Sequence, residues 1–357
     1  MKKIKVLHIL WSGIKGGAEK NVADIVTGLN GSDFDMAVLF MSKKDYWGNF
    51  IESKGIKTYC LHLDTARSIK SIFAFVVFVI KSKYDIYHNH VSAPFVKIIL
   101  RILRRKVIQT MHNNPVTLNK MGMLKRKLTI SFADFYIAPS NYIKNYLEEQ
   151  YNIKSRHIYH GIEIIPPKFI TKHEHIDIGI CKIGVVTHLE KIKGNDILIN
   201  AAKMLTDRGI FNFKIFIAGT GTEYNKLKSL IDRLSISKHV KMCGYVQDVN
   251  DFLNDMDIFA SASLNESLGI SVLEAMAKGL PVVCMNIPAF LEIVVDNSNG
   301  FVCYPNPRDI SEKLGKLIDD RGLRKRFGEA SYKIASEKFN LNDILKQYRE
   351  FYQRCAI

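Results

Sequence analysis

Short apolar runs alternate with helical patterns along the whole chain of 357 residues. In the first half, the runs that predict strands span residues 4–10, 36–40, 57–61, 86–88, 107–110, 135–138 and 157–159. In the second half, they span residues 181–186, 214–218, 240–243, 258–261 and 282–285. Because amphipathic segments separate the runs, this rhythm predicts an α/β architecture in which parallel sheets are covered by helices on both faces.

The rhythm pauses over residues 163–177, where Pro166 and Pro167 precede a polar cluster that is typical of a linker. We therefore predict two doubly wound, Rossmann-like domains facing each other across a cleft, over residues 1–165 and 166–339. A final helical pattern within residues 340–357 is expected to pack back on the first domain. In sheets of this kind, ligands bind beyond the carboxyl ends of the strands.

Composition favours a protein of a reducing compartment. The six cysteines stand singly, mostly in apolar runs, without the paired spacing of a zinc site or a disulfide framework.

Lys5 and His8 interrupt the apolar start of the chain, so we interpret this segment as a strand rather than a signal peptide. The apolar run over residues 72–80 is shorter than the roughly 20 residues that span a bilayer. We expect a cytoplasmic protein.

The basic side chains are unevenly distributed. Residues 1–165 hold 25 Lys and Arg against 12 Asp and Glu, whereas residues 166–357 hold 26 against 23. The first half therefore carries most of the net charge of +16 and predicts an anionic partner, such as a membrane surface or a phosphorylated substrate. The alternative is a basic composition general to the source organism. No aromatic-interleaved basic motif or zinc motif supports nucleic-acid binding.

The segment over residues 94–106 predicts an amphipathic helix. Phe95, Ile98, Ile99 and Ile102 fall on one helical face. The basic residues of the opposite face and of the segment that follows are Lys97, Arg101, Arg104, Arg105, Lys125, Arg126 and Lys127. We interpret them as a face that attaches to an anionic membrane, close to a lipid-linked acceptor. The alternative is a core-packed helix with a solvated basic face.

Two carboxylates stand near the start of a predicted helix in NESLGISVLEAMAKGLP, residues 265–281. Glu266 precedes Gly269, and Glu274 follows about two helical turns later. A helix N-terminus offers free N–H groups and a partial positive charge to a diphosphate, and a carboxylate accepts hydrogen bonds from sugar hydroxyls. The alternative is a solvated helix with two surface glutamates, although a charge at Glu274, within an apolar run, is costly without partners.

This segment resembles the nucleotide-sugar domain of retaining glycosyltransferases of the GT-B fold, family four. The other segments that agree with the family in order are Gly16 to Glu19, Asp85 to His90, Ala133 to Ser140, Leu189 with Lys193 and Gly194, Gly219 to Gly221, Gly244 with Tyr245, Glu292 to Val294, and Asn299 with Gly300. The resemblance therefore extends over almost the whole chain.

The resemblance implies a set of site residues. Those implied to bind the donor are Gly16, Gly17, His188, Lys193, Gly219, Glu266, Ser267, Leu268, Gly269 and Glu274. Lys193 is implied to bind the diphosphate, Glu266 the sugar hydroxyls and Glu274 the ribose. His112, after a strand, is implied to orient the donor sugar, so that Glu266, His112 and Lys193 are the candidate catalytic residues.

His188 departs from the family, because arginine is usual at that position. A neutral imidazole binds phosphate more weakly than a guanidinium group. His88, His90 and His112 have no carboxylate or cysteine beside them at metal-ligand spacing, and the family expectation is catalysis without a metal. We therefore predict no metal and no cofactor.

The resemblance implies transfer of a hexosyl unit, with retention, from a nucleotide diphosphate sugar to a hydroxyl group. We expect a UDP-sugar donor and a glycan or polyprenyl-diphosphate-linked acceptor, in capsule, O-antigen, lipopolysaccharide or exopolysaccharide synthesis at the inner face of the cell membrane. Two alternatives remain. A UDP-sugar 2-epimerase of the same fold would need acidic general bases in the first domain, and a catalytically silent partner would only bind a nucleotide sugar.

Overall fold

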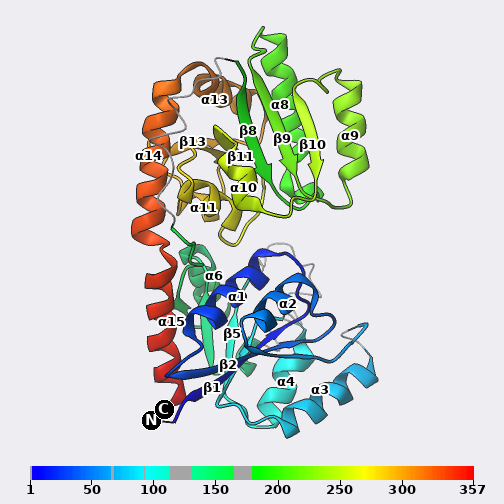
Figure 1. The fold of residues 1–357 in the computed structure, drawn as a ribbon, viewed down its shortest axis with the longest axis vertical. Coiled ribbons are helices and arrows are strands. Elements are labelled where there is room, and N and C mark those ends of the chain that lie inside the picture. Colours follow the sequence, from blue (N-terminus) through cyan, green and yellow to red (C-terminus); the bar gives the residue numbers. More distant parts are fainter. Residues whose placement is uncertain (1, 66–67, 92, 113–129, 165–178) are drawn as a thin grey trace. The chain divides into compact units, whose positions relative to one another are not determined.

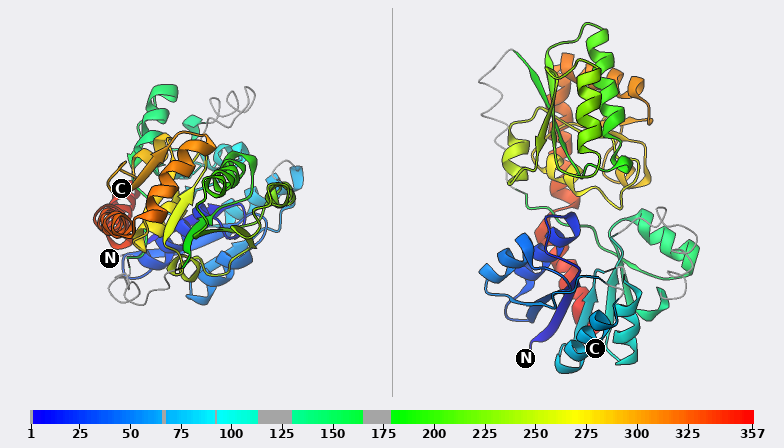
Figure 2. Two further views of the ribbon diagram at one scale, coloured as in Figure 1. Left: turned by 90° about the horizontal axis from the view of Figure 1, so that it is seen from above. Right: turned by 90° about the vertical axis from the view of Figure 1, so that its right-hand side faces the viewer.

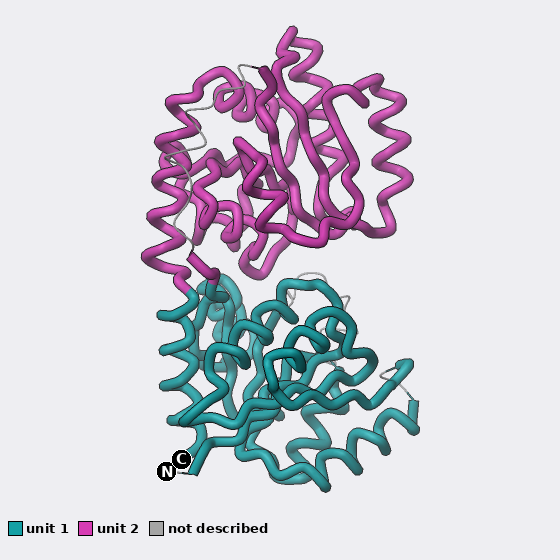
Figure 3. The backbone as a smooth tube through the Cα atoms, viewed as in Figure 1, with its two compact units in different colours: residues 1–161, 341–357 teal, residues 162–340 magenta. Residues whose placement is uncertain are grey.

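The computed structural model describes residues 2–65, 68–91, 93–112, 130–164 and 179–357. The chain divides into two compact units (Figure 3): unit 1 is Met1–Gly161 with Leu341–Ile357, and unit 2 is Ile162–Asn340. The boundaries predicted from the sequence fall after residue 165 and before residue 340. Most of the predicted linker, and Lys125, Arg126 and Lys127, lie outside the described residues.

Unit 1 is built on a parallel sheet of seven strands in the described residues, in the order β3-β2-β1-β4-β5-β6-β7. Strands β1, β2 and β5 of this sheet are labelled in Figure 1. Its strands are β1 (Ile4–Leu10), β2 (Phe34–Phe40), β3 (Lys57–Cys60), β4 (Ile86–Asn89), β5 (Val107–Thr110), β6 (Phe135–Ala138) and β7 (Arg156–His157). Its helices are α1 (Gly17–Leu29), α2 (Asp45–Ser53), α3 (Ile69–Lys81), α4 (Pro94–Ile102), η2 (Ile130–Phe132), α6 (Asn141–Tyr151) and α15 (Leu341–Ala356).

Alternation along the strands divides the core of unit 1 into two layers. Val6 and Leu10 of β1 face the layer that holds α1 and α15, whereas Leu7 and Ile9 face the layer that holds α3 and α4. Successive side chains of a strand point to opposite faces, so a strand with apolar residues at both alternating sets of positions must be covered on both faces. The apolar run at residues 4–10 predicts this arrangement.

Helix α15 joins the core of unit 1 from the far end of the sequence. Its buried residues Ile344, Tyr348, Tyr352 and Cys355 recur at helical spacing and pack beside α1. Close packing extends to Gly28 of α1, where a side chain would lie 2.3 Å from a methyl group of Leu345. The last 17 residues therefore complete a core that the first 161 begin.

Unit 2 is built on a parallel sheet of six strands in the described residues, in the order β10-β9-β8-β11-β12-β13. Its strands are β8 (Cys181–Val186), β9 (Phe213–Ala218), β10 (Val240–Gly244), β11 (Ile258–Ser261), β12 (Val282–Met285) and β13 (Gly300–Cys303). Its helices are η3 (Lys191–Lys193), α8 (Asn195–Asp207), α9 (Tyr224–Arg233), α10 (Val249–Asn254), α11 (Ile270–Ala277), α12 (Pro288–Leu291), α13 (Pro307–Asp319) and α14 (Arg321–Lys338). Helices α8 and α13 lie side by side (Figure 2).

Strand β13 was missed by the sequence analysis. It holds only four residues, begins at a glycine and follows polar residues, so its apolar pattern is too short to stand out. The glycine is required because a side chain at Gly300 would lie 2.2 Å from the carbonyl oxygen of Val282 on β12. The close approach of the two strands thus explains the glycine of the Asn299–Gly300 motif.

The prediction of a basic face on α4 was wrong in part. Lys97 is buried together with Val96, Ile99 and Leu100, whereas Ile102, predicted on the apolar face, is 71% exposed. The helix packs against the sheet through a face shifted by about one residue, because Val96 and Leu100 complete the apolar stripe that Ile102 was expected to join.

The other three residues predicted on the basic face of this segment have different surroundings. Arg105 is half-buried and donates a hydrogen bond to the carbonyl oxygen of Val79 on α3, at 3.1 Å. Arg101 is exposed and pairs with Asp134 at 3.0 Å, and Arg104 is also exposed. No helix of the described residues is both long enough and apolar enough to cross a bilayer.

We expect Ile344→Ala to lower the free energy of unfolding of unit 1 by about 2–5 kcal/mol, because it opens a cavity between α15 and the sheet. Urea unfolding followed by tryptophan fluorescence would measure it, since both tryptophans, Trp11 and Trp47, belong to unit 1. The control is Ile357→Ala, a fully exposed residue. An unchanged midpoint in Ile344→Ala would contradict the packing of α15 on unit 1.

Candidate active site

An ion pair joins two predicted site residues of unit 2. Lys193 ends η3 in the loop after β8, and Glu266 lies in the loop after β11. The Lys193 Nζ and Glu266 Oε1 atoms are 2.7 Å apart, and each side chain is about one-fifth exposed. Because β8 and β11 are neighbours at the point where the strand order reverses, their carboxyl-end loops meet there. The ammonium and carboxylate are thus held together at the position where such sheets bind ligands.

Backbone contacts fix these two loops against each other. The N–H group of Leu264 donates to the carbonyl oxygen of Ile192 at 2.9 Å. Gly194 adopts a left-handed conformation with φ of +60°, and a side chain there would lie 2.3 Å from the carbonyl oxygen of Ala262. Only glycine combines this φ with this approach at no steric cost. The glycine that follows Lys193 is therefore needed to bring the lysine loop to the Glu266 loop.

Helix α11 begins beside Glu266. Gly269 precedes its first residue with φ of +101°, and a side chain there would lie 2.6 Å from the Phe290 ring. The first N–H groups of a helix have no partner within it, so this N-terminus can bind an anion. Leu268 is fully buried, while Ser267 is half-buried.

Glu274 is half-buried on α11 between the buried residues Leu273 and Ala275. It interacts with other protein groups. A carboxylate among apolar neighbours needs such partners. The position is therefore not the freely solvated surface glutamate that the alternative interpretation assumed.

Gly219 and His188 belong to a second pair of loops. The N–H group of Leu189 donates to the carbonyl oxygen of Thr220 at 2.9 Å, and a side chain at Gly219 would lie 1.8 Å from the carbonyl oxygen of Thr187. Gly219 thus permits contact between the loops after β8 and β9. The side chain of His188, in the loop after β8, is exposed.

The two predicted site glycines of unit 1, Gly16 and Gly17, lie at the start of α1. Gly16 precedes the helix in an extended conformation, and Gly17 is its first residue. A side chain at Gly16 would lie 2.4 Å from a carboxylate oxygen of Glu19, and burial raises the pKa of Glu19. The predicted anion-binding loop therefore holds a carboxyl group of its own, a feature that the sequence analysis did not weigh.

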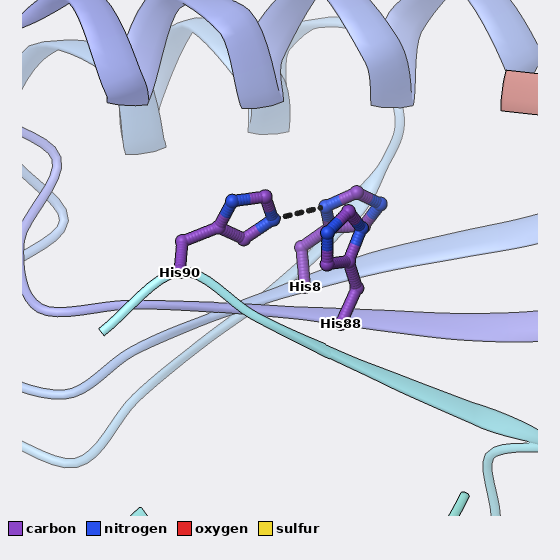
Figure 4. Close-up of side chains that lie close together, drawn as sticks. All are labelled: His8, His88 and His90. Carbon is purple, nitrogen blue, oxygen red and sulfur yellow. Dashed lines mark hydrogen bonds between the residues drawn. The ribbon is translucent and has the colours of Figure 1, made fainter. Parts of the chain in front are cut away.

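Three buried histidines gather where the strand order of unit 1 reverses (Figure 4). His8 of β1 and His88 of β4 are register partners, and His90 follows β4 directly. Nδ1 of His8 and Nε2 of His90 are 3.0 Å apart, and the cluster is fully buried apart from a small part of His90. Sequence periodicity explains the arrangement, since positions 88 and 90 share one face of a strand.

The cluster extends to two further residues. Nδ1 of His90 lies 2.7 Å from Nε2 of His112, which follows β5. The hydroxyl of Tyr352 on α15 lies 2.7 Å from Nδ1 of His88 and 3.3 Å from Nε2 of His8. His112, a predicted site residue, is therefore connected through histidines to the C-terminal helix.

A ligand atom from each of His8, His88 and His90 lies within 4.8 Å of the others, a separation compatible with a metal ion. Each of their six ring nitrogens already has a hydrogen-bond partner, the last being Oγ1 of Thr110, 2.7 Å from Nε2 of His88. A metal ion would have to replace several of these bonds. The geometry favours a hydrogen-bonded network.

Burial lowers the pKa of every histidine in this group and of His160, whose ring centroid lies 5.5 Å from that of His112. The pKa falls to about 3 for His8 and to about 4 for His112, and it lies well below its usual range for His88, His90 and His160. Removing an imidazolium ion from water is costly, so the neutral rings are favoured. The rings are therefore uncharged near neutral pH.

Matches to known families cover most of the chain. Residues 15–164 match the family described as Glycosyltransferase Family 4, and residues 179–334 match Glycosyl transferases group 1. An uncharacterized glycosyltransferase of Methanocaldococcus jannaschii is 28% identical over 282 residues, which are 76% of each chain. The capsular polysaccharide biosynthesis glycosyltransferase CapM of Staphylococcus aureus is 29% identical over 172 residues, 48% of this chain and 45% of CapM.

The fold has a close counterpart in a solved structure. HepE of Anabaena, in complex with UDP and glucose, superimposes with a TM-score of 0.85 at 22% identity, over 98% of this chain and all of HepE. This protein is a glycosyltransferase of the GT-B fold.

Two polar residues of the transferase, Tyr352 and Asn195, were not predicted from the sequence. Tyr352 carries no motif and meets the histidines only through the return of α15. Asn195 and His160 are buried, and their side-chain nitrogen and oxygen atoms have no hydrogen-bond partner within the described part of the chain. Asn195 follows Gly194 directly, so its place beside the lysine loop was the one signal available.

We expect the transferase to lose stability as the pH falls from 7.5 to 5. The pKa of His8 drops from 6.5 when solvated to about 3 when buried, so below pH 6.5 the unfolded chain binds a proton that the folded chain does not. At pH 5 this costs the folded state about 2 kcal/mol for His8 alone. Tryptophan-monitored urea unfolding at several pH values would measure it, and His8→Asn should flatten the slope. A wild-type midpoint independent of pH over this range would refute the prediction.

Proposed function

We propose that this transferase moves a hexosyl unit from a UDP-sugar to a hydroxyl group, with retention of anomeric configuration. The observation that carries the proposal is the Lys193–Glu266 pair beside the N-terminus of α11, where the strand order of unit 2 reverses. A cation, a helix N-terminus and a carboxylate at one place match a diphosphate joined to a sugar.

Lys193 would hold the diphosphate. An ammonium group has three N–H donors, and the contact with Glu266 occupies one. At about 4 Å and an effective dielectric constant of about 20, one ammonium–phosphate contact is worth roughly 4 kcal/mol before desolvation. The charge that develops on the leaving phosphate would strengthen this contact in the transition state. Lys193 would thereby favour departure of the nucleotide.

The remaining site residues would orient the donor. Glu266 would accept hydrogen bonds from sugar hydroxyls and Glu274 from the ribose, while His112 would position the sugar. His188 would lie beside the diphosphate in place of the family's arginine. Each role follows from the resemblance and from the chemistry of these groups.

The bond changes would balance without a protein nucleophile. The bond between the anomeric carbon and the phosphate oxygen breaks, and the acceptor oxygen bonds to that carbon on the same face. The acceptor's proton passes to the leaving phosphate oxygen. The proposal includes no metal ion, because Lys193 and the N-terminus of α11 would supply the positive charge.

The names of similar proteins support a UDP-sugar as the donor and polysaccharide biosynthesis as the pathway. HepE was solved with UDP and glucose, and CapM is named for capsular polysaccharide biosynthesis. We therefore propose a UDP-sugar donor and a glycan or lipid-linked acceptor in the synthesis of a surface polysaccharide.

We expect Lys193→Ala to weaken UDP binding about 10- to 100-fold, the usual loss for a hydrogen bond to a charged group. Binding of uridine, which lacks the diphosphate, should be unchanged, and calorimetric titration of both ligands would separate the two effects. Lys191→Ala, in the same turn and exposed, is the matched control. Wild-type affinity for UDP in Lys193→Ala would move the diphosphate site elsewhere.

A membrane-facing surface is better supported on α3 than on α4. Ile69, Phe73 and Ile80 are 84%, 68% and 57% exposed and recur on one side of α3, while Lys70 and Lys81 are exposed at its ends. Helix α4 is in contact with α3 and ends at the exposed residue Ile102, and the exposed Arg104 follows it. Apolar side chains bordered by basic ones suit the surface of an anionic bilayer. We therefore propose that unit 1 attaches to the membrane through α3.

Flotation with phosphatidylglycerol vesicles tests this surface. Wild-type protein should float at low salt and less at high salt, because screening weakens the basic contribution. The double variant Ile69→Ser/Phe73→Ser should remain at the bottom of the gradient, whereas Phe211→Ser, an exposed residue of unit 2, should float like wild type. Wild type that stays unbound, or a double variant that floats normally, would overturn the proposal.

A further inference from the structure

A continuous chain of hydrogen bonds runs through the core of unit 1. Its members, in order, are Thr110, His88, Tyr352, His8, His90 and His112. The five links measure 2.7, 2.7, 3.3, 3.0 and 2.7 Å in that order. Each histidine between the ends uses one ring nitrogen toward each neighbour, so the chain has no branch.

Such a chain can hold its protons in only two ways. A neutral imidazole carries a proton on one ring nitrogen and a lone pair on the other, and a tyrosine hydroxyl donates one bond while it accepts another. Because burial keeps these imidazoles neutral, the direction of one link fixes the direction of all the others. The proton of His112 then lies on Nε2 in one arrangement and on Nδ1 in the other.

The free end of the chain indicates which arrangement is favoured. Nδ1 of His112 is buried and has no hydrogen-bond partner among the described residues. A buried N–H group without an acceptor is rarer in proteins than an unused lone pair, so the lone pair is assigned to this nitrogen. Tyr352 then donates to Nδ1 of His88 at 2.7 Å and accepts from the Nε2–H group of His8 at 3.3 Å.

The remaining links follow from that choice. Nδ1 of His8 has the lone pair and accepts from Nε2–H of His90, and Nδ1 of His90 accepts from Nε2–H of His112. Nδ1 of His112 is then an acceptor, and it is buried without a hydrogen-bond partner in the described residues. An unpaired buried acceptor costs about 1–3 kcal/mol, which a bound O–H group would recover.

We propose that Tyr352 is a positioning residue that acts through His8 and His90 to hold His112 with its proton on Nε2. Nδ1 of His112 is thereby kept as an acceptor for a substrate hydroxyl. The role in substrate binding rests on the proposed function, whereas the position of the proton does not. The C-terminal helix thus determines which kind of hydrogen bond His112 offers.

Nitrogen-15 NMR of histidine-labelled protein tests the proton position directly, because protonated and unprotonated ring nitrogens have distinct shifts. His112→Gln assigns the His112 signals. The wild type should show Nε2–H at His112. Tyr352→Phe removes the acceptor for His8 Nε2–H, so the chain should reverse or become mixed, with protonated Nδ1 appearing at His112.

Tyr348→Phe is the matched control. Tyr348 is also fully buried on α15, one turn from Tyr352, and its hydroxyl bonds to none of these histidines. The control should keep the wild-type signals of His112. Nδ1–H at His112 in the wild type would overturn the proposal without any variant, as would an identical His112 signal in wild type and Tyr352→Phe.

Titration with UDP-sugar, followed by kinetics, tests the second part. The Nδ1 signal of His112 should move on donor binding, and Tyr352→Phe should raise the donor KM about ten-fold more than Tyr348→Phe does. If the NMR result holds but KM and the Nδ1 signal do not respond, the tautomer assignment stands and the role in substrate binding fails. If the wild type does not bind the UDP-sugar at all, the proposed function is refuted instead.

Discussion

In each sheet of this transferase, the strand order reverses beside the first strand of the unit, next to β1 and next to β8. The helical connections there lead to opposite faces of the sheet, so the loops at the carboxyl ends of the two central strands are left with room between them. Both groups of candidate site residues occupy these positions. Lys193 and Glu266 follow the central pair of unit 2, whereas His8, His88 and His90 lie on or follow β1 and β4 of unit 1, and His112 follows the neighbouring strand β5.

The polar groups at these two positions differ in their exposure to water and in their charge. In unit 2, opposite charges remain partly exposed, so the lysine keeps contact with solvent and with any anion that binds. In unit 1, a set of imidazoles is taken out of water and loses its charge, and hydrogen bonds replace the lost hydration. Burial of a polar ring is costly unless its nitrogens are paired, which places strict demands on the surrounding helices.

Helix α15 supplies part of this pairing. The hydroxyl of Tyr352 lies within hydrogen-bond distance of both His88 and His8, and the apolar residues of the helix complete the core that α1 begins. Stability and site geometry therefore depend on the same helix. This coupling explains why a segment remote in sequence belongs to unit 1 and not to the unit that precedes it along the chain.

The sequence by itself determined the parallel α/β architecture and most strand positions, because these depend on local periodicity. It also indicated the two loops that hold Lys193 and Glu266, because the motifs there are only a few residues long. Strand β13 escaped because four residues after a glycine carry too little pattern. The buried face of α4 was misplaced because helical periodicity alone leaves the rotation of a helix uncertain by one residue, and packing decided that Lys97 lies inside. Only the tertiary structure could join His8, His88, His90 and His112 to Tyr352, since hydrogen bonds between residues up to 344 positions apart depend on how the chain closes on itself.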